Sequence, residues 1–350
     1  SDGAVSQYNY LEQTMINWAY TTLNAIPALL EAESIEGYVL DEFKSPMPEV
    51  EVVIISENSD KIILKTTTDG NGFYSFTLPV NNDDTFTIRA RKQTLEDAYI
   101  YQVKALSGCD NYFANTIYMS YVDNVNPYDA SITLYDATNS TSLLPGAVLT
   151  IRNGINALSG DVIATGTSDN NGLVKLSLRS GNYTGEIQKN DYETSYFPII
   201  INRDHTVVSG YTVKSLNDGE MQILTTHSDP ALDVDTLLFT SAIPAYVSSK
   251  NTGAAPIAES IKVLNSNNGV FRFMAYDYNN CMAGDSMNYA LSSSNALVTV
   301  FHADGYVASY SVPAAHGGVI WDVLRIRNGT VLPINHYYSV IPPNSYWTTK

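Results

Sequence analysis

The chain of 350 residues is poor in cysteine, which limits both its crosslinks and its chemistry. Its two cysteines, Cys109 and Cys281, lie far apart and outside any C-x-x-C or Cys/His spacing. This count excludes a disulfide framework, and the spacing gives no metal or redox motif. Two interpretations are open: two buried small apolar side chains, or one bridge between modules.

Positive charge and long apolar runs are also lacking. Lys and Arg total 19 against 36 Asp and Glu, which gives a formal net charge of −17. Such a charge repels nucleic acid and anionic membrane surfaces. No apolar run reaches about 20 residues, the length of a membrane-spanning helix. We therefore expect no nucleic-acid partner and no membrane span.

Motifs that mark catalytic sites are missing as well. None of the five histidines lies in an H-E-x-x-H or similar metal-binding pair. No G-x-S-x-G, P-loop or dinucleotide-binding fingerprint occurs either. The sequence therefore predicts a protein that is not an enzyme.

What the sequence does contain is an internal repeat. Residues Thr67–Leu78 read TTDGNGFYSFTL, and Thr167–Leu178, 100 positions on, read TSDNNGLVKLSL. Each copy is a turn of Asp, Asn and Gly that leads into a strand alternating apolar with polar residues. Upstream, Pro48–Ile54 recurs as Pro145–Ile151, 97 positions on. Two β-modules built on one plan are therefore expected in the first two-thirds of the chain.

The length and the repeat together predict the architecture. At roughly 150 residues per domain the chain should hold two or three domains, and the repeat favours three. Short strands at regular spacing with turn residues between them are typical of β-sandwiches. We expect an all-β fold with a short N-terminal helix in residues 1–33, tandem Ig-like or transthyretin-like β-sandwiches in 34–126 and 127–214, and a larger C-terminal β-sandwich domain in 215–350.

The first module has a recognisable pattern. Gly37-Tyr38-Val39 forms an opening G-x-V strand, Pro48–Ile54 a proline-bearing loop and Val-rich strand, and Thr68–Phe76 a T-D-x-x-G-x-Y-x-F hairpin. This pattern resembles the carboxypeptidase regulatory-like modules, also called transthyretin-like or prealbumin-like. The resemblance covers most of residues 35–90. It implies an accessory seven-stranded sandwich without catalytic residues of its own.

The second module has a related pattern. Leu144-Pro145-Gly146-Ala147, followed by Val148–Ile151, is similar to the collagen-adhesin B-type repeats of bacterial surface stalks. Those repeats often carry a Lys–Asn isopeptide bond with the Lys on the first strand. The first strand expected here, Ala130–Tyr135, has no Lys. We therefore expect no such bond.

The last third has three recognisable segments, Gly219–Leu224, Phe271–Tyr278 and Ile320–Asn335, of which the last is the most specific. These segments resemble those of an uncharacterised secreted bacterial β-domain that often follows regulatory-like modules. The family's Trp after Leu224 is missing, and its His corresponds to Leu237. A site that depends on this His is therefore lost.

Candidate metal ligands lie in the same region, at Asp229, Asp233 and Asp235. On a strand, Asp233 and Asp235 would point to one side about 6.5 Å apart. Calcium takes several oxygen ligands of this kind, and Asp277 and Glu259 are candidates to complete the set. The alternative is a solvated acidic face of an edge strand, where charge prevents aggregation. No other cofactor is expected.

Together these features predict a bacterial protein that is extracellular or on the cell surface. We expect a spacer and adhesion or ligand-binding protein, with an extracellular glycan or protein as its ligand. The alternative is an accessory, non-catalytic region of a larger secreted hydrolase. The three Trp residues are too scattered to mark a sugar-stacking platform, and Trp321 is predicted to lie in the core.

Overall fold

The computed structural model describes residues 34–77, 85–104, 111–122, 126–138, 142–203, 206–228, 232–240, 246–249, 258–264, 266, 269–284, 288–313 and 317–338. The predicted N-terminal helix, Cys109 and Asp229 lie outside these residues. Inside them the chain is almost entirely β-structure, as predicted, with two short helices, α2 (Tyr278–Ala283) and α3 (Ala290–Ser293). Cys281 is free and buried. In this part of the chain, no helix is long and apolar enough to cross a membrane.

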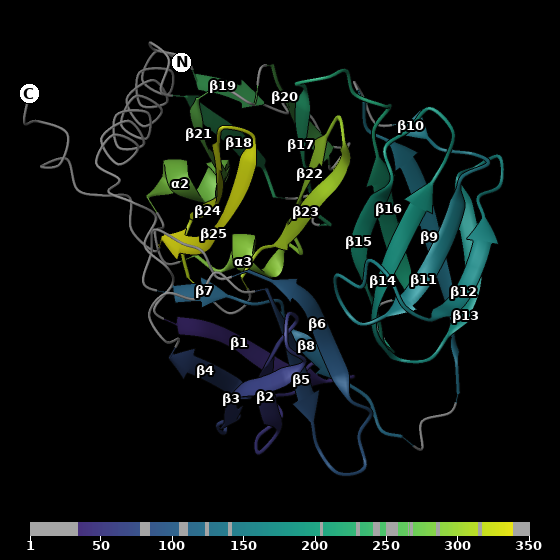
Figure 1. The fold of residues 1–350 in the computed structure, drawn as a ribbon, viewed down its shortest axis with the longest axis vertical. Coiled ribbons are helices and arrows are strands. Elements are labelled where there is room, and N and C mark those ends of the chain that lie inside the picture. The colour runs from purple at the N-terminus through teal and green to yellow at the C-terminus, as the bar shows by residue number, and fades with distance from the viewer. Residues whose placement is uncertain are drawn as a thin grey trace, which may run out of the picture.

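The first unit is a sandwich of two sheets (Figure 1). Its strands are β1 (Ser34–Asp41), β2 (Glu51–Ser56), β3 (Lys61–Thr67), β4 (Phe73–Thr77), β5 (Phe86–Arg91), β6 (Ala98–Val103), β7 (Asn111–Phe113) and β8 (Ile117–Met119). One sheet has the order β3-β2-β5-β6. In the other, β1 pairs antiparallel with β4 and parallel with β7 and β8.

The second unit repeats this plan. Its strands are β9 (Tyr128–Asp136), β10 (Ser142–Leu143), β11 (Val148–Asn153), β12 (Val162–Thr167), β13 (Leu173–Leu178), β14 (Gly181–Gln188), β15 (Ser195–Ile201) and β16 (Val207–Thr212). The order β12-β11-β14-β15 matches β3-β2-β5-β6. Strand β9 pairs antiparallel with β13 and parallel with β16, as β1 does with β4 and with β7 and β8. The prediction of two modules built on one plan is confirmed.

The repeated turn is held by the same bonds in both units. Asp69 Oδ1 accepts hydrogen bonds from the N–H groups of Asn71 and Phe73 at 2.8 and 2.9 Å. Asp169 Oδ1 accepts from the N–H groups two and four residues further on, at the same distances. Gly172 closes the second turn with a φ of 69°, a conformation that glycine adopts without steric cost.

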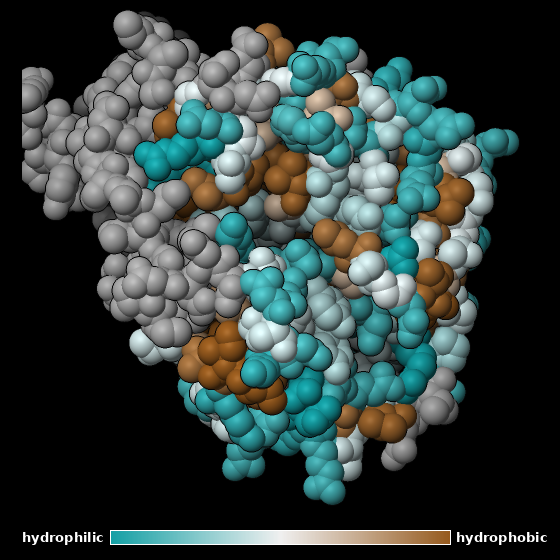
Figure 2. Space-filling model, viewed as in Figure 1, coloured by the Kyte–Doolittle hydropathy of each residue, from teal (hydrophilic) through white to brown (hydrophobic). Residues whose placement is uncertain are grey.

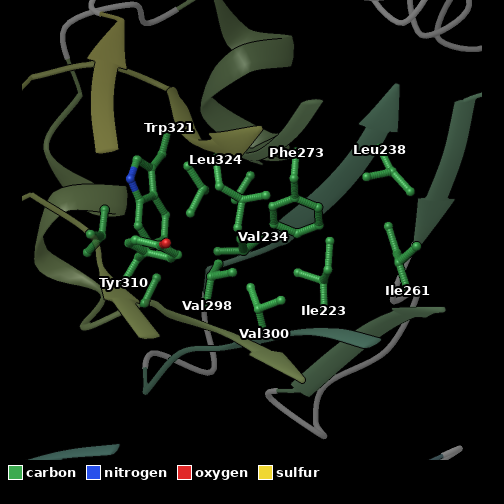
Figure 3. Close-up of a cluster of buried hydrophobic side chains, with 14 of the residues drawn as sticks. Ile223, Val234, Leu238, Ile261, Phe273, Val298, Val300, Tyr310, Trp321 and Leu324 are labelled. Carbon is green, nitrogen blue, oxygen red and sulfur yellow. The ribbon is translucent and has the colours of Figure 1, made fainter. Parts of the chain in front are cut away.

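The third unit is a larger sandwich of two sheets. Its strands are β17 (Met221–Thr226), β18 (Val234–Thr240), β19 (Tyr246–Ser249), β20 (Ala258–Val263), β21 (Val270–Asp277), β22 (Leu297–His302), β23 (Gly305–Ser311), β24 (Ile320–Arg327) and β25 (Thr330–Tyr338). The sheet orders are β20-β17-β22-β23 and β19-β18-β21-β24-β25. Trp321 is fully buried between them, as predicted, in a cluster with Phe273, Leu324 and Tyr310 (Figure 3).

Two tight hairpins lie in this unit. Asn328 and Gly329 join β24 to β25 with φ values of 48° and 80°, as a tight two-residue turn requires. In the other hairpin, between β22 and β23, the Asp304-Gly305 dipeptide is typical of a two-residue turn, but Gly305 already pairs with His302. The turn therefore lies one residue earlier, because Gly305 continues the strand.

The three units form a closed arrangement, in which each contacts the other two (Figure 1). Each has its own apolar core. Strand β7 of the first unit contacts β25 of the third, although more than 200 residues separate them. The chain therefore folds back on itself, while the predicted domain boundaries stay a prediction.

Two glycines with the same backbone conformation allow the repeated turn to be tested. A Cβ on Gly172 would lie 2.6 Å from the Leu134 carbonyl oxygen, whereas a Cβ on Gly146, at a φ of 69°, would meet nothing within 4 Å. Each Gly→Ala change forces a left-handed L-residue, which costs about 1–2 kcal/mol. We expect Gly172→Ala to lower the melting temperature by several degrees more than Gly146→Ala. Equal losses would contradict the close contact.

Candidate functional site

The predicted acidic site is only partly assembled. Asp233 lies one residue before β18, and Asp235 lies within it. Asp235 is buried, and its Oδ2 accepts a hydrogen bond from the Tyr276 hydroxyl at 3.0 Å. Because β18 lies between β19 and β21, the alternative of a solvated edge-strand face is wrong.

The charged neighbour of Asp233 is Asp277. Burial and the negative charge of Asp277 raise the pKa of Asp233. Asp277 caps α2, since it accepts hydrogen bonds from the N–H and side-chain amide of Asn280 at 3.1 and 2.6 Å. Glu259 accepts a hydrogen bond from Thr236 at 3.3 Å. No group of three or more acidic, His or Cys residues within the described ranges is arranged to hold a metal, so the calcium site stays a prediction.

A different site forms where the three units meet. The loop after β11 docks on the edge strand β6 of the first unit. Ile155 N–H donates to the Tyr99 carbonyl, and Tyr101 N–H donates to the Ile155 carbonyl, both at 2.9 Å. Gly154, with a φ of 89°, permits this approach, because a Cβ there would lie 2.7 Å from the Tyr101 ring. The loop therefore extends the sheet of the first unit by one short pairing.

The third unit is bonded to the first through buried amides. Asn335 Oδ1 accepts a hydrogen bond from Trp321 Nε1 at 2.8 Å, and Asn335 Nδ2 donates to the Phe113 carbonyl. Asn115 Nδ2 donates to Ser311 Oγ at 2.7 Å. These bonds bring β7 against β25 and fix one side of the junction.

The third unit also contacts the second. Ser309 Oγ donates to the Tyr196 carbonyl at 3.0 Å, and the rings of Tyr196 and Tyr306 meet edge to face at 4.9 Å. Gln222 Nε2 donates to the Thr138 carbonyl at 3.0 Å. All three pairs of units are therefore joined by direct hydrogen bonds.

A cavity of about 180 Å³ lies at this junction. Figure 2 shows the surface hollowed close to where the units meet. Exposed side chains mark its mouth, and buried ones lie deeper. Its lining residues come from all three units: Thr85, Gln102, Lys104 and Tyr112 from the first, Asn156 and Leu158 from the second, and Tyr306, Val307, Ala308, Ser309, Tyr310, Val331 and Pro333 from the third.

Two lining residues have a left-handed backbone. Gln102 and Asn156 each have a φ of 58°. Glu57 holds Gln102 in place, because its carboxylate accepts hydrogen bonds from the N–H and Nε2 of Gln102, both at 2.8 Å. Such residues cost about 1–3 kcal/mol and cluster at functional sites. Here both lie on the lining of one cavity.

Several polar residues of the lining have side chains without a hydrogen-bond partner in the described part of the chain. Tyr112 and Tyr310 are each only 8% exposed, yet their hydroxyls make no hydrogen bond within the described chain. Burial raises the pKa of Tyr112 to about 12, and burial with the phenols of Tyr112 and Tyr306 raises that of Tyr310. Both are therefore neutral hydroxyls at physiological pH. The side chains of Asn156 and Lys104 likewise have no partner among the described residues.

The cavity was not predicted from the sequence, although the repeat contains a signal for it. Ile54 and its counterpart Ile151 are 97 positions apart in the sequence. Their partners on the next strand, Leu64 and Ala164, are 100 positions apart. The second copy therefore has three extra residues after β11. They belong to the loop 154–161, which docks on β6 and lines the cavity.

Comparisons with known proteins add little to this description. No protein-family model and no curated protein matches the chain. Among solved structures, the Bacillus anthracis TIE protein shares 17% identity over 70% of this chain and 45% of its own, with a TM-score of 0.22. A streptococcal ancillary pilin shares 13% over 55% of this chain and 64% of its own (TM-score 0.23), and a DUF3823 family protein from Bacteroides ovatus shares 12% over 53% and 98% (TM-score 0.20). The chain spans less than two-thirds of the first two, and similarity at this level carries no argument about function.

The raised pKa of Asp233 gives a prediction for stability. The folded state binds this proton more tightly than the unfolded chain, so the contribution to stability is present at low pH and lost as pH rises through the folded pKa. We expect Asp233→Asn to raise the melting temperature slightly at neutral pH in calcium-free buffer. At about pH 3, below the usual Asp pKa, the difference should vanish.

The same variant tests the calcium site. If Asp233 and Asp235 bind calcium, the ion should raise the melting temperature of the parent protein but not of Asp233→Asn. A parent melting temperature that stays constant from zero to about 10 mM calcium would contradict the calcium interpretation.

Proposed function

We propose that this chain is a non-enzymatic ligand-binding protein of the bacterial cell surface or extracellular space, and that it binds a saccharide in the junction cavity. The observation that carries this proposal is the set of polar residues on the cavity lining whose side chains have no partner among the described residues. The hydroxyls of Tyr112 and Tyr310, the amide of Asn156 and the ammonium group of Lys104 come from different units. Binding sites typically combine apolar walls with a few such polar groups.

The size of the cavity suits one sugar ring. An apolar cavity of about 150 Å³ accommodates benzene, so a cavity of about 180 Å³ has room for the six-membered ring of a pyranose, whose outer substituents would extend into the mouth. Tyrosine rings offer flat apolar surface to the C–H groups of a sugar, while hydroxyl and amide groups bond to its oxygens. An extended peptide, in contrast, would need a longer groove.

The closed arrangement favours binding over the expected spacer role. In a spacer, units stacked end to end contact only their neighbours and gain length. Here Asn115 and Asn335 join the first and third units directly, which shortens the molecule and creates the cavity. A shared ligand site is a direct benefit of this closure.

The identity of the units is also part of the proposal. We take the first two as carboxypeptidase regulatory-like modules, close to collagen-adhesin B-type repeats, and the third as the secreted bacterial β-domain. The shared strand order and the identical bonds at Asp69 and Asp169 support a common module. An accessory region of a larger secreted hydrolase would use the same cavity to hold its saccharide substrate.

Filling the cavity mouth tests the proposal. Leu158 lies on the lining and is exposed, so Leu158→Trp should occupy the space of a bound ring without disturbing a core. We expect the parent protein to retain saccharides on a glycan array, and Leu158→Trp to weaken that binding by more than about tenfold.

A matched control comes from the same unit. Leu143 is an exposed residue of β10 outside the lining, so Leu143→Trp should bind as the parent does. Thermal melting of both variants checks that they are folded. Failure of the parent to bind any saccharide, or equal binding by Leu158→Trp, would overturn the proposal.

A further inference from the structure

We infer that the saccharide carries a carboxylate, as a hexuronic acid does, and that Lys104 binds this group. The inference rests on the proposed function, because Lys104 lines the same cavity. It adds the charge of the ligand, which the proposed function leaves open.

The described part of the cavity wall is positively charged. Lys104 is the one charged side chain among the described residues of the cavity wall. Glu57 bonds to the lining residue Gln102 and accepts a hydrogen bond from the Thr87 hydroxyl at 3.0 Å, but it is not itself part of the wall. The described wall of the cavity therefore bears one positive side chain and no negative one.

Lys104, unlike several other cations of the protein, has no ion-pair partner among the described residues. The protein has 36 acidic residues against 19 basic ones, and several of its cations are paired. Examples are Arg152 with Glu186 at 2.8 Å and Lys262 with Glu220 at 2.9 Å. Lys104 is half-buried, yet within the described ranges it makes neither an ion pair nor a hydrogen bond. A half-buried ammonium group that no described acid pairs with can bind an external anion.

The chemistry of the neighbours decides the class of anion. One ammonium group balances one negative charge, which fits a carboxylate better than a phosphate dianion. The hydroxyls of Tyr112 and Tyr310 and the amide of Asn156 are neutral and suit the hydroxyls of the same ring. A hexuronate meets both demands, because its ring bears a single carboxylate beside several hydroxyls. Its bond to Lys104 is charge-assisted and therefore stronger than any that a neutral hexose makes.

Methyl glycosides of a hexose and of the matching hexuronate test this inference in the gluco, galacto and manno configurations. The two members of each pair differ only in a hydroxymethyl or carboxylate group. By calorimetry with the full chain, we expect the preferred hexuronate to bind about tenfold or more tightly than its hexose. The preference should shrink as salt is added, because screening weakens the interaction of exposed charges.

Variants of the lysine separate charge from shape. Lys104→Met keeps the aliphatic stem and should reduce the hexuronate affinity to that of the hexose, whereas Lys104→Arg should keep the preference. Lys175→Met removes an exposed lysine outside the lining and should change nothing.

The remaining outcomes distinguish failure of this inference from failure of the proposed function. Equal binding of hexose and hexuronate by the parent, lost in Leu158→Trp, would overturn this inference and leave the proposed function standing. A preference for hexuronate that survives in Lys104→Met would also overturn it. If no member of any pair binds, both the inference and the proposed function are wrong.

Discussion

The closed arrangement depends on the two hydrogen bonds that the side-chain amide of Asn335 makes. Asn335 is 2% exposed and has a φ of 45°, a conformation that asparagine tolerates better than most residues. Its oxygen satisfies the indole N–H of Trp321, in the core of the third unit, and its nitrogen reaches the Phe113 carbonyl in the first. A buried polar group left without a partner costs about 1–3 kcal/mol. Separating the first and third units would leave the buried amide nitrogen of Asn335 without its partner, so this hydrogen bond stabilises their contact.

Closure also resolves a general problem of β-sheets. Strands β6, β15, β23 and β25 each end a sheet, and an open edge is a template for aggregation. All four edges contribute to the junction: Ile155 pairs with β6, Ser309 on β23 bonds to Tyr196 on β15, and Asn335 on β25 bonds to Phe113. The opposite edges β3 and β12 face solvent, and both contain a bulge, which disrupts further pairing. One end of each repeated sheet is thus covered by a neighbour, and the other is protected by its own irregularity.

Much of the fold was readable from the sequence, because its determinants are local. The turn at Asp69 and its copy at Asp169 are made by residues within four positions of each other. Period-two alternation then sets which face of each strand is buried. Strand order is not local, and this explains why the alternative of an edge-strand face at Asp235 was wrong. It lies on β18, which only the pairing with β19 and β21 makes an inner strand.

The cavity escaped prediction for the same reason. Lys104, Asn156 and Tyr310 lie on different units and are brought together only when those units pack. None belongs to a motif, and each is unremarkable in its own segment. The change of the repeat offset from 97 to 100 was the one local trace, since it marks the loop after β11. An insertion in one copy of a repeat marks a segment whose structural role differs between the two copies.

The two equivalent loops of the repeat in fact act on the same strand. In the first unit, the loop after β2 places Glu57 beside β6, where its carboxylate holds Gln102. In the second unit, the longer loop after β11 reaches across and pairs Ile155 with β6 two residues earlier. Corresponding loops of the two modules therefore both form hydrogen bonds with strand β6. This double attachment places the left-handed residues Gln102 and Asn156 together at the cavity, so a structural repeat becomes a single composite site.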